Sequence, residues 1–148
     1  PGAETRRLWV LNQSTGEDLK ATFFRNGGWD PVALEELDYL LRDWHADAVA
    51  PIDWQIYEIL ARVQEQIGGR EPVQVVSGYR TEATNRRLRG DGAVPNSFHT
   101  RAMAVDFWIY GVPTWRLARA ARAAGAGGVG SYPRRGFVHI DVGPVRTW

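Results

Sequence analysis

The chain contains no cysteine in its 148 residues, and it has only three histidines. Without cysteine, disulfide bonds, thiol catalysis and cysteine-ligated metal centres are excluded, although this absence does not assign a compartment. The chain also lacks any apolar run near the roughly 20 residues that a membrane-spanning helix needs. We therefore expect a globular core without a transmembrane span, and 44% hydrophobic residues are enough to form one.

Charge is nearly balanced overall but is divided unevenly along the chain. Residues 1–69 hold six Lys/Arg and twelve Asp/Glu, a net charge of −6, whereas residues 70–148 hold twelve Arg and five Asp/Glu, a net charge of +7. A basic half can attract nucleic acid, a carboxylate-rich peptide or an anionic envelope polymer, and it can equally be a solvated surface. Charge alone does not choose among these partners.

Helix signals occur in four places. Asp30 and Pro31 suit the N-cap and first position of a helix over residues 30–44, whose apolar stripe is Leu34, Leu37, Leu41 and Trp44. Asp53 can cap a second helix that ends near Gly68, with the stripe Ile56, Leu60, Val63 and Ile67. Shorter helices are predicted over residues 81–89 and 113–125.

Strand signals surround these helices and become more frequent in the second half. Apolar, β-prone runs predict strands at 9–12, 19–24, 72–80, 103–110, 127–133 and 136–143. No repeat, low-complexity tract or linker interrupts them. The pattern predicts an α+β fold in which residues 1–148 form a single domain, with helices flanking a central antiparallel sheet.

Two predicted strands carry polar residues on one face. In MAVDFWIY, Asp106 lies on the face opposite Val105 and Phe107, and in GFVHIDVG, His139 and Asp141 lie opposite the apolar residues Val138, Ile140 and Val142. If these strands are neighbours with the polar faces aligned, Asp106 and His139 converge. His99, seven residues before Asp106, could complete the group from the preceding loop.

Two imidazoles and one carboxylate suit zinc. Three protein ligands leave the fourth tetrahedral position open, which is the arrangement of catalytic rather than structural zinc sites. Zinc there lowers the pKa of a water molecule toward roughly 7 and polarises a carbonyl group. Taken singly, a histidine in a loop beside a strand is more often an ordinary polar surface residue.

Several short motifs resemble one known family. SFHTRAMAVD resembles the Ser-x-His-x-x-Gly-x-Ala-x-Asp motif of the zinc peptidases related to D-Ala-D-Ala carboxypeptidases. FVHID resembles the segment with the last zinc ligand, and SGYR resembles the arginine-bearing turn. GGVGSYPRRGFVHIDVGPVRTW is similar to the C-terminal signature of the murein endopeptidase K branch. Two earlier segments resemble the N-terminal half of the same branch, STGEDLKATFFRNGGWDP and LLRDW. The matching residues are Ser97, His99, Ala104, Asp106, His139 and Arg80.

The resemblance implies a zinc metallopeptidase, a hydrolase of peptide bonds in peptidoglycan stem peptides or cross-links during cell-wall remodelling. It assigns His99, Asp106 and His139 as ligands of Zn²⁺ and Arg80 as the group that binds a substrate carboxylate or the oxyanion. A fixed guanidinium suits either task. The resemblance also implies a location in the bacterial periplasm or envelope. The chain opens with PGAETRR, and a signal peptide is expected upstream of it but is not visible in this sequence.

Two positions depart from the family pattern. The motif glycine is Ala102, a change that should be harmless unless the backbone there needs a positive φ. Many relatives place a catalytic acid three residues before the last histidine, where this chain has Gly136. Asp141 could serve instead as the base, or it could only orient the imidazole of His139. Other sources of a base are loop acids such as Asp91 or the substrate's own carboxylate.

Three functions remain in competition. The zinc peptidase is favoured by the ligand set together with Arg80. A catalytically impaired zinc module that binds peptidoglycan is favoured by the missing acid. Nucleic-acid binding would use the cluster Arg86, Arg87 and Arg89, but no nucleic-acid motif accompanies it, so we expect a peptidoglycan peptide and not nucleic acid as the partner. We read His45 as a surface residue, and the oligomeric state is not predicted.

Overall fold

The computed structural model describes residues 4–91 and 93–148; residues 1–3 and 92 lie outside it. The helices of the described residues are α1 Pro31–Leu40, α2 Trp54–Gln66, α3 Glu82–Arg87 and α4 Thr114–Ala123, with 3₁₀ turns at Leu88–Asp91 and Phe98–Arg101. The strands are β1 Arg6–Asn12, β2 Asp18–Arg25, β3 Gly28–Trp29, β4 Val73–Ser77, β5 Ala104–Trp108, β6 Gly128–Tyr132, β7 Phe137–Asp141 and β8 Arg146–Thr147. The predicted helices and strands are all present, and β3 and β8 are additional.

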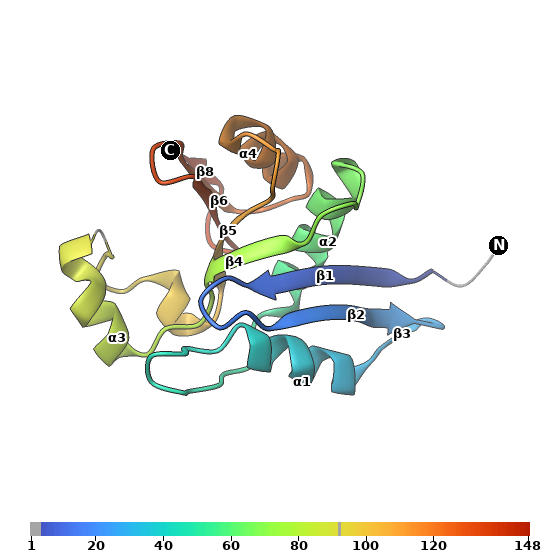
Figure 1. The fold of residues 1–148 in the computed structure, drawn as a ribbon, viewed down its shortest axis with the longest axis horizontal. Helices are drawn as coiled ribbons and strands as arrows, with labels where there is room; N and C mark the ends of the chain where they lie inside the picture. The colour runs from blue at the N-terminus through green and yellow to red at the C-terminus, as the bar shows by residue number, and fades with distance from the viewer. Residues whose placement is uncertain (1–3, 92) are drawn as a thin grey trace.

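The strands form one sheet in the order β3-β2-β1-β4-β5-β7-β6-β8 (Figure 1). The predicted α+β class is confirmed. The sheet is mixed rather than purely antiparallel, since β1 pairs with β4 and β6 pairs with β8 in parallel. In both pairs other elements lie between the partners, so the chain has returned before it pairs again: β2, β3, α1 and α2 lie between β1 and β4, and β7 lies between β6 and β8.

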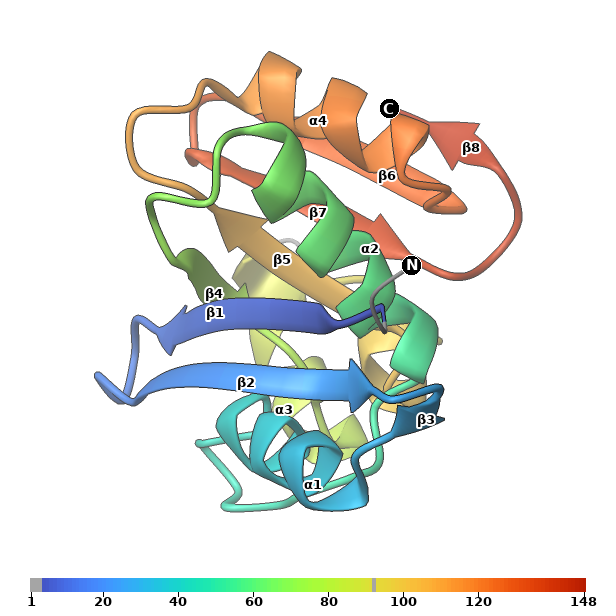
Figure 2. The ribbon, with the colours of Figure 1, turned by 90° about the vertical axis from the view of Figure 1, so that its right-hand side faces the viewer.

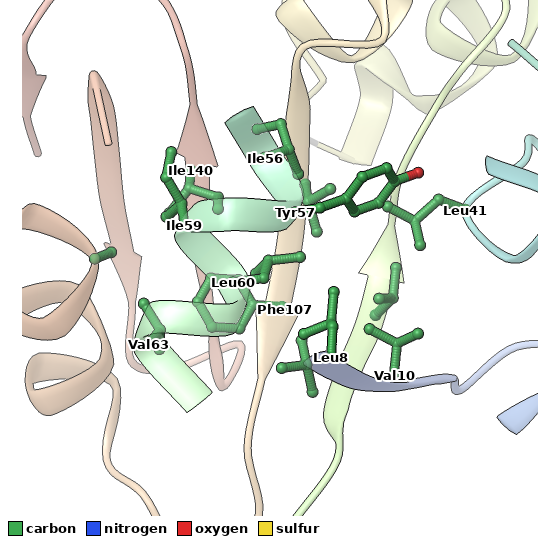
Figure 3. Packing of buried hydrophobic residues seen from close by; sticks show 14 of the residues in the cluster. Leu8, Val10, Leu41, Ile56, Tyr57, Ile59, Leu60, Val63, Phe107 and Ile140 are labelled. Carbon is green, nitrogen blue, oxygen red and sulfur yellow. The ribbon is translucent and has the colours of Figure 1, made fainter. Parts of the chain in front are cut away.

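The helix α2 packs on one face of the sheet, and His139 lies on the opposite face. Figure 2 shows α2 and α4 in front of the sheet, with α3 behind it. The apolar stripe of α2, which includes Ile56, Leu60 and Val63, is buried against Leu8, Val10, Phe107 and Ile140 of the strands (Figure 3). The alternation along β7 therefore sends Val138 and Ile140 into this core and His139 to the opposite face.

The first helix is shorter than its apolar stripe predicts. Asp30 caps it as expected, because its carboxylate accepts hydrogen bonds from the backbone N–H of Val32 and Ala33. The helix ends at Leu40, however, and Trp44 is 44% exposed, so the prediction that Trp44 continues the stripe was wrong. The physical reason is the buried carboxylate of Asp43, which accepts bonds from nearby backbone N–H groups and stabilises a loop instead of another helical turn.

Candidate metal centre and its pocket

Asp106 and His139 lie directly opposite each other on the antiparallel strands β5 and β7. Opposite residues point to the same face of the sheet, so their side chains meet. Nδ1 of His139 lies 2.9 Å from Oδ1 of Asp106, and Nε2 lies 2.7 Å from Oδ2 of Asp141. Burial opposes protonation of this imidazole, but its hydrogen bonds to the two carboxylates outweigh burial and raise the pKa of His139 to about 9.

His99 reaches the same carboxylate from the 3₁₀ turn that precedes β5. Ser97 caps this turn by accepting a hydrogen bond from the backbone N–H of His99. Nδ1 of His99 lies 2.8 Å from the carbonyl oxygen of Gly78, so that nitrogen donates its proton there. Nε2 then faces Oδ1 of Asp106 at 3.2 Å. Gly78 is needed because a Cβ at this position would lie 2.5 Å from the carbonyl oxygen of Leu41.

His99, Asp106 and His139 together form a group of ligand type, as the sequence pattern predicts. One ligand atom from each residue lies within 4.8 Å of the others, and His99 and Asp106 are buried. Although burial opposes ionisation of Asp106, the neighbouring imidazoles hold the pKa of that carboxyl well below its usual range. The donor set of two nitrogens and one carboxylate, with the other nitrogen of each imidazole anchored, fits a divalent metal.

Arg80 extends from the turn after β4 toward this group. Its Nη2 donates to Oδ2 of Asp106 at 3.3 Å, its Nε to Ser77 Oγ at 2.9 Å, and its Nη1 to Asn85 Oδ1 at 3.1 Å. These three bonds hold the planar guanidinium in one orientation beside the candidate metal ligands. Arg80 therefore lies just after β4 and contacts the candidate ligand Asp106.

Asp141 lies on the other side of the His139 ring from Asp106. Its buried carboxylate contacts Nε2, whereas Nδ1 is the nitrogen that faces the candidate metal position. It also accepts hydrogen bonds from the backbone N–H of Gly128 and Gly143 and from the guanidinium of Arg146. Although burial opposes ionisation, the hydrogen bonds with His139, Arg146 and the Gly143 N–H hold the pKa of Asp141 well below its usual range. Of the two roles, this geometry favours orientation of the imidazole over acid–base chemistry.

The two departures from the family pattern have different structural consequences. Ala102 has a φ of 57° and ψ of 38°, so the backbone is left-handed and the alanine is strained by about 1 kcal/mol. The expectation that this substitution is harmless was conditional on a negative φ, and that condition is not met. Gly136 also has a positive φ, 79°, in the turn between β6 and β7, where its N–H donates to the carbonyl oxygen of Tyr132.

A pocket of about 500 Å³ opens in front of these residues. Its walls include side chains that sequence reasoning did not assign to the site: Trp44, His45, Tyr132, Arg135, Arg146 and Trp148. His45 is partly exposed, as predicted, but it lies on this wall and stacks on Trp44. The side chain of Asp91 lies outside the described part of the chain. For Arg146 and Trp148, the sequence offers only the end of the family signature, VRTW, as a sign of a role in the site. The strand β8 has two residues and is too short to show a periodic pattern.

No helix in the described part of the chain combines the length and apolarity needed to cross a bilayer.

Comparison with known proteins gives consistent matches along the chain. The family model described as peptidoglycan L,D-endopeptidase MepK matches residues 1–148. The peptidoglycan L,D-endopeptidase MepK of Escherichia coli strain K12 is 43% identical over 145 residues, which cover 97% of this chain and 80% of the relative. The probable peptidoglycan L,D-endopeptidase MepK of Haemophilus influenzae is 39% identical over 146 residues, covering 97% and 78%. The chain therefore belongs to the peptidoglycan L,D-endopeptidase MepK family of metallopeptidases.

Proposed function

We propose that residues 1–148 form one zinc peptidase domain that hydrolyses peptide bonds in peptidoglycan stem peptides or cross-links. The single observation that carries this proposal is the convergence of His99, Asp106 and His139 within 4.8 Å beside a pocket that also contains Arg80. Family membership supports the substrate class, since the relatives are named peptidoglycan L,D-endopeptidases. The name also suggests a scissile bond between an L- and a D-configured centre.

Zinc is the metal that the donor set supports best. His99 would bind it through Nε2 and His139 through Nδ1, because the other nitrogen of each ring is held by Gly78 and Asp141, respectively. Asp106 would supply the third ligand atom. When bound, zinc would polarise the scissile carbonyl and lower the pKa of a water molecule toward roughly 7.

Arg80 is proposed to bind a carboxylate of the substrate or the oxyanion that develops during hydrolysis. Two features support this role: three hydrogen bonds fix its guanidinium, and it shares the pocket with Arg135. Burial and the positive charge of Arg135 both lower the pKa of Arg80, with Asp106 opposing them, which indicates that the two cations face the same region. Peptidoglycan peptides are rich in carboxylates, so a pair of arginines suits them.

Asp141 is proposed to orient His139 and fix the proton on Nε2, rather than to act as the general base. This leaves the source of the base open, since the family position for an acid is Gly136. That gap supports a second candidate, a zinc module that binds peptidoglycan without cleaving it. In either case we place the protein in the periplasm or cell envelope, where its substrate is located.

Digestion of purified murein tests the proposal and separates these two candidates. The wild-type protein, with and without a chelator, and the His99→Ala, His139→Ala double variant are incubated with murein, and the products are identified by mass spectrometry. We expect new peptide termini only with the metal-loaded wild type. Binding of murein without new termini would support the impaired module and would refute the peptidase.

A further inference from the structure

The glycine-rich stretch Gly127–Gly130 lies against the last residues of the chain. A Cβ at Gly128 would lie 2.4 Å from Asp141 Oδ2 and 2.5 Å from Arg146 Nη1. A Cβ at Gly130 would lie 2.4 Å from the Trp148 ring. Neither glycine has a positive φ, so close approach and not backbone freedom explains them. The motif GGVG therefore makes room for the C-terminal residues.

Backbone pairing holds these residues against β6. The strand β8 pairs in parallel with β6, with Arg146 beside Gly128 and Thr147 beside Val129. The backbone N–H of Trp148 donates to the Val129 carbonyl oxygen at 3.0 Å, and the Ser131 N–H donates to the Trp148 carbonyl oxygen at 2.9 Å. The chain thus reaches the pocket at its C-terminal end.

Arg146 forms an ion pair with the carboxylate of Asp141, which contacts His139. Its Nη1 donates to Asp141 Oδ1 at 3.0 Å and its Nη2 to Oδ2 at 2.8 Å, a bidentate pair. Asp141 is fully buried, whereas the side chain of Arg146 is 37% exposed. A pair in which both partners are exposed would contribute little. Here one partner is a buried anion whose Oδ2 contacts Nε2 of His139.

Trp148 contacts the same imidazole directly. Its ring centroid lies 5.3 Å from that of His139, and its Nε1 donates to the hydroxyl of Tyr132 at 2.6 Å. The indole is therefore held in place by a hydrogen bond at its edge, and its ring is tilted by 42° to that of His139. Both C-terminal side chains act on one residue, a candidate metal ligand.

We propose that Arg146–Trp148 is a C-terminal clamp that positions His139 for metal binding. Arg146 acts through Asp141, which fixes the proton on Nε2 and leaves Nδ1 for the metal, and Trp148 restrains the tilt of the ring. Arg146 is a positioning residue, since it contacts Asp141 and would not itself hold the metal. The inference deepens the proposed function and rests on His139 being a ligand. Groups that orient ligands in this way change metal affinity by about 10–100-fold.

Zinc affinity measured by competition with a chromophoric chelator tests the clamp independently of peptidase activity. We expect about 10–100-fold weaker binding by Arg146→Ala, an intermediate loss in Arg146→Lys, which keeps the charge but not the bidentate fork, and no change in Arg119→Ala. Arg119 is the matched control, because it is an exposed arginine on α4.

A second measurement separates positioning from a general loss of stability. In the zinc-loaded protein, the Nε2–H proton of His139 should give a slowly exchanging resonance in nuclear magnetic resonance spectra. We expect that proton to exchange faster in Arg146→Lys. This variant allows the test to be made even if Arg146→Ala does not fold. Wild-type zinc affinity and proton exchange in a folded variant would overturn the clamp and leave the peptidase intact. A wild type that binds zinc but cleaves no murein would refute the peptidase and leave the clamp intact, and a wild type that binds no zinc would overturn both.

Discussion

The two halves of the sheet bury polar groups in different ways. Around β1 the buried polar residues are neutral and serve the backbone: Asn12 donates to the Leu40 carbonyl oxygen, and Gln64 bonds the backbone of Trp9 and Glu71. Around β5 and β7 a group of ionisable side chains, His99, Asp106, His139 and Asp141, is buried or partly buried, and its members contact one another. The same sheet therefore carries a neutral, structural network and a charged network.

This difference indicates that the region around β5 and β7 is less favourable for folding stability and is suited to a functional site. Neutral side chains that satisfy backbone groups stabilise a fold at little desolvation cost. Burying the carboxylates of Asp106 and Asp141 carries a large desolvation cost that close partners must offset. Shifted pKa values in a pocket are a feature of functional sites, and here they occur at Asp106 and His139 in the pocket and at Asp141 behind His139. Substitutions in the two halves should therefore fail in different ways.

The largest expected effect is the loss of a ligand in the charged half. His139→Ala should abolish stoichiometric zinc binding and reduce murein cleavage by several orders of magnitude, because the metal moves the pKa of water from about 15.7 to about 7. Metal analysis and product quantification by mass spectrometry check this. Full zinc occupancy in His139→Ala would remove the assignment of this residue as a ligand.

A substitution in the neutral half should have the opposite signature. Phe23 on β2 is fully buried and stacks against Trp29, so Phe23→Ala should lower the free energy of unfolding by about 3–5 kcal/mol. Zinc affinity and turnover per folded molecule should remain at wild-type values. Denaturant titration alongside activity measures both, and a loss of turnover in the folded fraction would break the contrast between the halves.

Arg80 should affect the reaction more than the metal. Arg80→Ala should lower kcat/KM by at least ~100-fold while zinc stays bound, since removal of one oxyanion donor costs on the order of 3 kcal/mol. Kinetics on a defined peptidoglycan peptide, with metal analysis of the same sample, gives both values. Arg119→Ala is the control, and unchanged kinetics in Arg80→Ala would make Arg80 a structural residue.

Asp141 should affect the metal more than the reaction. Asp141→Asn should weaken zinc binding by roughly 10–100-fold, and excess zinc should restore activity, because an amide holds the imidazole less firmly than a carboxylate. If zinc affinity stays normal while the rate falls by about 10²–10⁴-fold, Asp141 is the general base instead. A titration of activity against zinc concentration distinguishes the two results.

A pH dependence of zinc binding should also be confined to the charged half. The raised pKa of His139, about 9 in the metal-free protein, means that its protonated form stabilises that state fully below about pH 6.5. This contribution is lost as pH rises to about 9. Zinc needs the neutral ring, so zinc affinity should increase over the same window by up to about tenfold per pH unit. Chelator competition at several pH values checks the sign, and a flat profile would contradict it.

The two halves also differ in what sequence patterns could predict. Alternation along GFVHIDVG was enough to separate Val138 and Ile140 from His139, because strand geometry alone sets which face a side chain takes. It could not show that Asp141 contacts the far nitrogen of the ring, since that depends on the side-chain conformations of both residues. The pairing of β8 with β6 joins two short segments in parallel, and no local pattern encodes it.

Backbone conformation and loop geometry set a further limit. Ala102 adopts a left-handed conformation that alanine seldom takes, and only the surrounding contacts select it. Trp44 continues an apolar spacing, but the carboxylate of Asp43 finds its hydrogen bonds in a loop and ends the helix first. Tertiary partners decided both cases, and a single sequence does not display them.

One metal held by the three converging side chains is the central feature of the proposed function. Diffraction from crystals of the zinc-loaded protein, recorded on both sides of the zinc absorption edge, locates that metal directly. We predict one anomalous peak at about 2.0–2.2 Å from Nε2 of His99, Nδ1 of His139 and a carboxylate oxygen of Asp106. A peak bound elsewhere, or no peak in protein that cleaves murein, would contradict the account.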